Sequence, residues 1–181
     1  MRLAAVLLLA LAPLAAAQPV LYDKSEIRFV SKQMGADVEG RFRRWKADVD
    51  FRPDDPAHSH ASFEVDLASI DLASEESEAE LRKRDWFDTQ RFPLATFRST
   101  SIASTGENAY DIAGTLAIKG ASRDVTVPVR LRKDAAGNAV AEGEFSLSRL
   151  AFKVGEGPWS DASAVADVVT VRVRITLGHA P

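Results

Sequence analysis

The sequence predicts an all-β fold, either an antiparallel sandwich or a barrel, and three observations support this. Most of the chain alternates apolar and polar residues with a period of two, so that successive side chains fall on opposite faces of a strand. Turn signals rich in glycine and asparagine separate the alternating segments. The chain has no cysteine and is 46% hydrophobic, so its stability must come from apolar packing rather than from disulfides or zinc–sulfur sites.

Residues 1–17 are predicted to be a secretory signal peptide. Arg2 supplies a positive start, residues 3–14 form an apolar run, and three alanines before Gln18 form a small-residue cleavage signal. The apolar run is too short to span a bilayer. We therefore expect residues 18–181 to form one domain, located in the periplasm.

The strands of this domain can be followed along the chain. Ile27 and Phe29 start the series, and the turns between later strands are expected at residues 106–108, 119–120 and 134–138. Short connections of this kind are typical of antiparallel neighbours. The later apolar rows are Phe63, Val65 and Leu67; Ile112, Gly114, Leu116 and Ile118; Val127, Val129 and Leu131; and Val171, Val173, Ile175 and Leu177.

The stretch from Val38 to Phe51 changes phase once. Its first apolar residues share one parity and its last ones the other, and the slip falls at Arg43-Arg44. A slip of one residue would turn every later side chain outward unless the chain bulges or bends. We therefore expect a sharp bend there, of the kind that helps a sheet to close.

One helix is expected to interrupt the strands. Residues 74–84 read SEESEAELRKR, with acids at the start and bases at the end, as the helix dipole favours. Ser74 or Ser77 can cap it, and Ser77 with Glu80 matches a capping box. Trp86 and Phe87 follow and are expected to turn inward at one end of the fold. Phe92-Pro93 ends this excursion before strand alternation resumes.

The region from residue 69 to 99 resembles the signature of the YceI-like family of secreted lipocalin-like proteins. The matching features are Ser69-Ile70, the short helix, residues 85–88 (DWFD), Phe92-Pro93 and residues 97–99 (FRS). Two positions depart from the pattern: Leu72 stands where the family usually has threonine, and Glu80-Leu81 where a His-Leu pair is common. Further matches are Gly40-Arg41-Phe42, Phe51-Arg52-Pro53 with Asp55-Pro56, and residues 114–120 (GTLAIKG).

The resemblance implies an antiparallel lipocalin-like β-barrel of about eight strands with one short helix. It also implies an isoprenoid lipid, such as a quinone or polyprenyl lipid, held inside without a cofactor or a catalytic step. Residues 147–169 resemble a branch of the family associated with b-type cytochromes of the inner membrane, which implies such a partner. The residues expected to contact the lipid are Phe29, Phe42, Phe63, Val65, Trp86, Phe87, Phe97, Leu116, Phe145 and Trp159, with Phe152 as a further candidate.

The same apolar residues would also build a filled core, and the sequence pattern does not separate the two cases. An eight-stranded barrel is about wide enough either to be filled by side chains or to hold one small ligand. The alternative to a carrier is therefore an interaction or stress-response protein with a filled barrel, acting beside a membrane cytochrome. The sequence also leaves open whether the protein forms a homodimer.

Motifs for catalysis, metals or nucleic acids are weak. The chain lacks the nucleophile elbow, the HExxH motif and the phosphate loop, so we expect no enzyme and no catalytic residues. His58 and His60 could supply two metal ligands, but no third is evident, so no metal site is expected. Residues 41–46 (RFRRWK) mix bases and aromatics, yet secretion and a formal net charge of −3 argue against nucleic acid.

Overall fold

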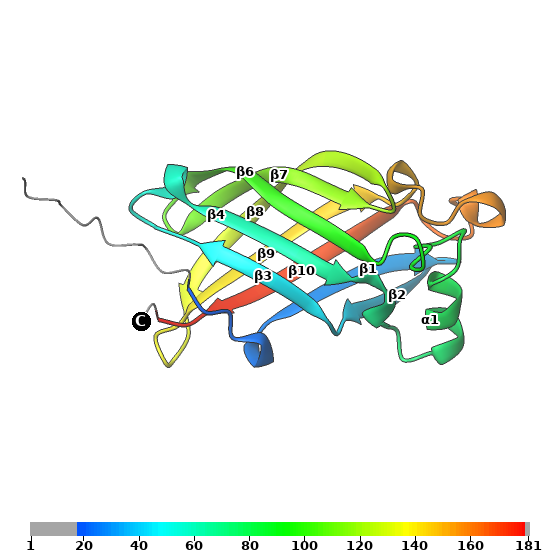
Figure 1. Ribbon diagram of the computed structural model, residues 1–181, viewed down its shortest axis with the longest axis horizontal. Coiled ribbons are helices and arrows are strands. Elements are labelled where there is room, and N and C mark those ends of the chain that lie inside the picture. The colour runs from blue at the N-terminus through cyan, green and yellow to red at the C-terminus, as the bar shows by residue number, and fades with distance from the viewer. Residues whose placement is uncertain (1–17, 180–181) are drawn as a thin grey trace, which may run out of the picture.

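The computed structural model describes residues 18–179, so the predicted signal peptide lies outside the described residues. The described chain forms one antiparallel ten-stranded sheet that curls around an elongated interior (Figure 1). The all-β antiparallel prediction is confirmed, but the expected count of about eight strands is wrong. The strands are β1 (Glu26–Gln33), β2 (Ala36–Phe42), β3 (Trp45–Asp50), β4 (His60–Asp66), β5 (Ile70–Asp71), β6 (Leu94–Gly106), β7 (Ala109–Ile118), β8 (Ala121–Lys133), β9 (Ala139–Ser148) and β10 (Val168–Leu177).

The two additional strands have identifiable causes. The predicted bend at Arg43-Arg44 breaks one long segment into β2 and β3, because both residues leave the strand ladder there. Their backbone N–H groups donate instead to Ser69, at 3.1 Å to its carbonyl oxygen and 3.0 Å to its Oγ. The second addition is the two-residue β5, which pairs with the end of β2. The break lets the inward rows of β2 and β3 both face the interior despite the change of phase.

The sheet order is β3-β4-β6-β7-β8-β9-β10-β1-β2-β5. The β2–β3 break carries the chain from one side of the sheet to the other, so one bent segment pairs with both β1 and β4. Residues 18–21 bridge the gap between β3 and β10. The Gln18 N–H donates to the Val49 carbonyl at 3.2 Å, and the Leu21 N–H donates to the Thr176 carbonyl at 2.9 Å.

The predicted turns connect neighbouring strands. Residues 107–108 join β6 to β7, residues 119–120 join β7 to β8, and residues 134–138 join β8 to β9. Asn108, Gly120 and Gly137 adopt the left-handed backbone that such tight turns require. Short connections therefore fix the register of the long strands, and with it which side chains point inward.

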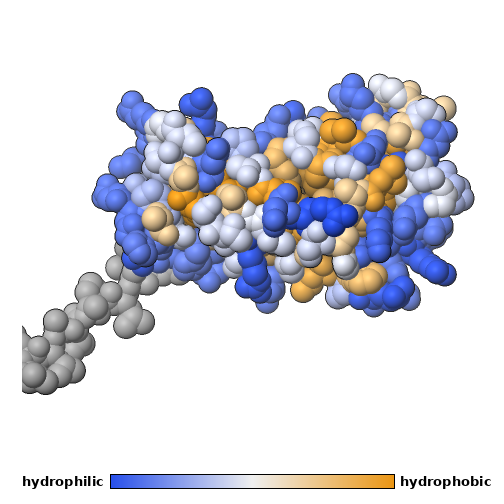
Figure 2. All heavy atoms as spheres, turned by 90° about the horizontal axis from the view of Figure 1, so that it is seen from above, coloured by the Kyte–Doolittle hydropathy of each residue, from blue (hydrophilic) through white to orange (hydrophobic). Residues whose placement is uncertain are grey.

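The outer face of the sheet carries charges in cross-strand pairs. Arg172 on β10 reaches Glu144 on β9 at 2.7 Å, and Arg132 on β8 reaches Glu142 on β9 at 2.8 Å. Hydrophilic side chains cover much of the face in Figure 2, and apolar ones are visible between them. Exposed pairs of this kind contribute little stability each, so the packing of the inner face matters more.

Helix α1 (Glu75–Leu81) lies at one end of the fold and is shorter than the predicted residues 74–84. Ser74 is its N-cap, and its Oγ accepts a hydrogen bond from the Ser77 N–H at 3.3 Å. The predicted capping box of Ser77 with Glu80 is therefore wrong. Glu78 instead reaches back and accepts from the Leu72 N–H at 3.1 Å. Short 3-10 turns are η1 (Tyr22–Lys24), η2 (Pro56–His58), η3 (Leu67–Ser69), η4 (Leu150–Phe152) and η5 (Gly157–Ser160). No helix within residues 18–179 is long and apolar enough to cross a membrane.

Ser74→Ala is expected to lower the free energy of unfolding by about 1 kcal/mol, because it removes the oxygen that caps α1. Ser77→Ala is the matched control, since its side chain makes no cap and its backbone N–H stays in place. Chemical denaturation of both variants measures the difference. Equal stability of the two variants would contradict the assignment of Ser74 as the cap.

A candidate lipid-binding cavity

The curled sheet encloses a cavity of about 550 Å³. This volume lies within the range of roughly 300–1,000 Å³ found for small-molecule sites. Its walls are almost entirely apolar and come from the inward rows of the long strands. All ten residues that the sequence proposed as lipid contacts line this cavity, and so does Phe152; their contact with a ligand remains a prediction.

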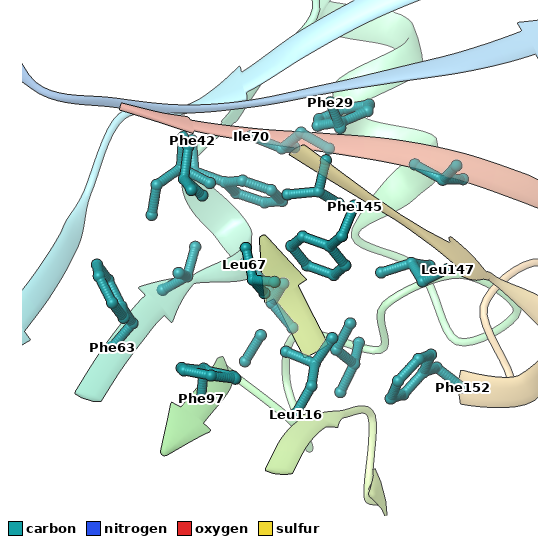
Figure 3. A pocket seen from close by; sticks show the side chains of 18 of the residues that line it. Phe29, Phe42, Phe63, Leu67, Ile70, Phe97, Leu116, Phe145, Leu147 and Phe152 are labelled. Atoms are coloured by element: carbon teal, nitrogen blue, oxygen red, sulfur yellow. The ribbon is translucent and has the colours of Figure 1, made fainter. Parts of the chain in front are cut away.

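The inward aromatic residues stand against the walls and leave a hollow between them (Figure 3). Phe29, Phe42, Phe63, Phe97 and Phe145 are each only half-buried, although they point to the inside of the sheet. Neighbouring rings contact one another around the wall, with centroids 5.7 Å apart for Phe29 and Phe42 and 6.4 Å apart for Phe63 and Phe97. Rings in a filled core would be fully buried, so this interior is hollow.

A packed cluster lies toward each end of the hollow. The end remote from α1 contains Val49, Ala61, Ile175 and Leu177, which form one buried cluster. The other cluster contains Trp86 and Phe152 together with Leu116, Ala121, Val154 and Val165. Trp86 and Phe87 thus turn inward as the sequence predicts, and Trp159 stacks on Trp86 with ring centroids 5.4 Å apart.

Polar lining residues mark an opening between α1 and the end of β1. Ser74, Ser77 and Gln33 line the cavity and are exposed at the surface. Ser31 and Glu80 also line the cavity and are half-buried. A ligand with an apolar tail and a polar end would therefore meet hydrogen-bonding groups on this side and hydrocarbon on the other.

Arg149 organises the wall beside this opening. Its side chain lines the cavity, is 3% exposed, and lies over the Trp86 ring at 5.6 Å. Burial lowers the pKa of its guanidinium, and the Asp167 carboxylate opposes that effect. The five N–H···O bonds of the guanidinium run at 2.7–3.1 Å to the carbonyl oxygens of Ala166, Val154, Gly155, Trp159 and Val165. One side chain thereby fixes the loop between β9 and β10.

Two more charged residues, Lys119 and Asp71, hold the segments around the cavity opening, which we call the rim. Lys119, in the turn between β7 and β8, is buried and donates from Nζ to the Lys153 carbonyl at 2.7 Å and to Glu156 Oε2 at 3.0 Å. Asp71 on β5 accepts from Arg41 Nε at 2.8 Å and lies 2.7 Å from Arg43 Nη2. Hydrogen bonds from Arg43 and Arg41 hold the pKa of Asp71 far below its usual range. These contacts fasten the rim segments to the sheet.

Acid is expected to weaken this rim through Asp71. Because its pKa is lower in the folded chain, its contribution to stability is present above the unfolded carboxyl pKa of about 3.9 and is lost as the pH falls toward the folded value. Melting temperatures measured from about pH 7 to about pH 2 should fall less steeply below pH 4 for Asp71→Asn than for the unmodified protein. Asp54→Asn, in an exposed turn, is the control. Parallel curves for all three proteins would rule out this role of Asp71.

The remaining polar motifs lie away from the cavity. His58 contacts Asp55 at 2.8 Å, and His60 lies 3.8 Å from Asp48 on the outer side of β4. Within residues 18–179 no group of three or more potential metal ligands comes together. In the segment RFRRWK, Arg44 pairs with Asp66 at 2.8 Å. The side chains of His58, His60 and Arg44 therefore lie on the outer surface, whereas Phe42 of the same segment lines the cavity.

Several lining residues were missed by the sequence prediction. Leu147 shares the parity of Phe145 on β9, and Leu67 continues the row of Phe63 and Val65, so alternation alone could have identified both. Ile70, at β5, and Arg149 had no such signal. Further wall residues that were not named as lipid contacts include Ile27, Val38, Phe51, Leu72, Leu81, Tyr110, Val171 and Val173.

Comparisons with known proteins agree with this architecture. The model of the YceI-like domain matches residues 20–177. A UPF0312 protein of Photorhabdus laumondii is 29% identical over 143 residues, covering 75% of this chain and 74% of that protein. The crystal structure of BcnA from Burkholderia cenocepacia superposes with a TM-score of 0.84 at 39% identity, covering 87% of this chain and 99% of the other. A polyisoprenoid binding domain from Saccharophagus degradans, implicated in plant cell wall breakdown, shares the fold with a TM-score of 0.72 at 15% identity, covering 93% and 100%. The chain belongs to the YceI-like family.

Proposed function

We propose that this protein is a periplasmic carrier that holds the tail of an amphiphilic isoprenoid, a quinone or a polyprenyl lipid, inside its sheet. The observation that supports this most directly is the hollow, apolar interior with a polar opening at one end. Each CH₂ group moved from water into such an interior contributes roughly 0.8 kcal/mol, so a tail of several units binds without many polar contacts. The Saccharophagus neighbour, described as a polyisoprenoid binding domain, supports the same ligand class.

The polar rim would hold the other end of the lipid. Gln33, Ser74 and Ser77 can donate or accept hydrogen bonds from a quinone ring, a hydroxyl or a headgroup oxygen. The ionisable lining residues of the described chain are Glu80, Tyr110 and Arg149, and the guanidinium of Arg149 is already engaged by backbone carbonyls. Such a lining suits binding and release, and the proposed role involves no covalent step.

Two separate observations support the proposed location of the protein and its proposed partner. The predicted signal peptide supports delivery to the periplasm. The segment that resembles the cytochrome-associated branch, residues 147–169, contains Arg149 and Trp159 and therefore lies beside the cavity. A b-type cytochrome of the inner membrane is accordingly the proposed protein partner, and a homodimer is the proposed alternative assembly. Affinity capture from solubilised membranes, followed by haem spectroscopy, tests the first, and native mass determination tests the second.

The decisive experiment is to purify the mature protein from its native compartment, determine its mass under native conditions, and extract and identify any bound lipid. A stoichiometric isoprenoid establishes the carrier role and names the cargo. A ligand-free protein that also fails to take up added quinone would overturn it and favour an interaction or stress-response role. Phe87→Ala and Trp159→Ala variants should then retain less lipid, because both residues line the cavity near its opening.

A further inference from the structure

Two glycines on the inner walls each lie beneath a phenylalanine ring. Gly40 on β2 pairs directly with Phe29 on β1. A Cβ added at Gly40 would lie 2.7 Å from Phe29 Cε1, closer still to Phe29 Cζ, and 2.6 Å from Leu72 Cδ2. These separations are far shorter than van der Waals contact. The Phe29 ring therefore lies flat against the backbone of Gly40 and occupies the space of a missing side chain.

The second recess is on the facing part of the sheet. Gly114 on β7 is adjacent to the inward ring of Phe97 on β6. A Cβ at Gly114 would lie 2.5 Å from Phe97 Cζ and 2.6 Å from Phe97 Cε2, and also 2.5 Å from the Arg98 carbonyl oxygen. Figure 3 shows Phe29 and Phe97 toward the edge of the hollow, whereas Phe145 projects toward its middle. Both rings are kept out of the lumen in the same way.

The position of these rings determines how wide the cavity is. Val38 and Phe42, which flank Gly40 at the same parity on β2, line the cavity, so a Cβ at residue 40 would point inward. The ring now lying there would have to swing into the lumen, since the sheet backbone is behind it. Neither glycine has a left-handed φ, so space and not backbone conformation is what demands glycine at these positions.

We propose that Gly40 and Gly114 are specificity-determining residues that set the bore of the cavity for a methyl-branched isoprenoid chain. This inference rests on the carrier function proposed above. An isoprenoid carries a methyl group on every fourth carbon of its chain and is therefore thicker than a straight acyl chain. By holding Phe29 and Phe97 flat, the two recesses leave room for those branches along the wall. A narrower bore would still admit a straight chain.

Gly40→Ala is the better test variant. The atoms that its new methyl group meets are the tips of the Phe29 and Leu72 side chains, which can move, whereas Gly114→Ala would also press on the Arg98 carbonyl. A second change, Phe29→Leu, removes the ring and should restore the bore. The matched control is Gly106→Ala, where the nearest atom would be the Ala109 Cβ at 3.9 Å.

The experiment compares geranylgeraniol with the straight-chain saturated alcohol of the same carbon number. Binding is followed by the intrinsic tryptophan fluorescence of the protein, to which Trp86 and Trp159 contribute from the cavity wall. Gly40→Ala should weaken geranylgeraniol binding about ten-fold, as overpacking would, and weaken the straight-chain alcohol much less. The double variant Gly40→Ala/Phe29→Leu should recover most of the geranylgeraniol affinity that Gly40→Ala loses. The control Gly106→Ala should bind both alcohols as the unmodified protein does.

Each other outcome has a distinct meaning. Equal weakening for both alcohols, no weakening, or no rescue by Phe29→Leu overturns the inference while leaving the carrier function in place. If Gly40→Ala does not fold, a folded double variant that binds geranylgeraniol supports the clash with Phe29, and an unfolded double variant overturns it. An unmodified protein that binds neither alcohol refutes the proposed function itself.

Discussion

Arg149→Ala is expected to lower the free energy of unfolding by about 3–5 kcal/mol, because five backbone carbonyl oxygens lose a charged hydrogen-bond donor. The guanidinium donates to five backbone carbonyls of the loop between β9 and β10, and the side chain is 3% exposed. Its removal leaves these carbonyls without their donor in a poorly hydrated place, and each unsatisfied buried group costs about 1–3 kcal/mol. The loop should then loosen beside the cavity opening.

Urea denaturation of three variants measures this effect. Arg149→Lys keeps the charge but has only three donors on a point-like ammonium, so it should recover part of the loss. Arg130→Ala removes an arginine from the exposed outer face of β8 and should change stability by less than about 0.5 kcal/mol. If Arg149→Ala proves no less stable than Arg130→Ala, the guanidinium does not hold the loop.

Alternation in the sequence was sufficient to predict the sheet and the inward rows. Phe63 and Val65 on β4, and Leu116 on β7, point inside because side chains in a strand alternate between the two faces, whether the space inside the curled sheet is filled or hollow. The phase slip at Arg43-Arg44 predicted a bend, but not that the chain would change pairing partners there. That change depends on Ser69, which is 25 residues away in sequence and accepts the freed N–H of Arg44.

The hollow itself could not be predicted from the rows, because a filled core uses the same residues. What opens the interior is where the rings lie, and this depends on glycines placed across from them, as at Gly40 and Phe29. Arg149 was also missed. A single arginine near the end of an alternating strand looks like a surface charge, and its five acceptors come from a loop that the sequence pattern does not position.

Phe97→Asp is expected to abolish uptake of an isoprenoid and to destabilise the fold by about 3–5 kcal/mol, as for loss of a large core aromatic. The ring lines the cavity, packs against Gly114 and lies near Phe63. A carboxylate in its place would stand in an apolar hollow without a partner, which is costly for the folded chain and repels a hydrocarbon tail.

The neighbouring substitution Arg98→Asp provides the control, because it places the same side chain one residue along β6, on the exposed outer face. Thermal melting and quinone uptake should therefore be nearly normal for Arg98→Asp and strongly reduced for Phe97→Asp. A protein that tolerated both changes equally would have neither face of β6 committed to the interior, and the rows assigned to the lipid would then be wrong. Loss of quinone uptake with a normal melting temperature for Phe97→Asp would instead show that water fills the unoccupied hollow and solvates the new carboxylate, which a filled core could not allow.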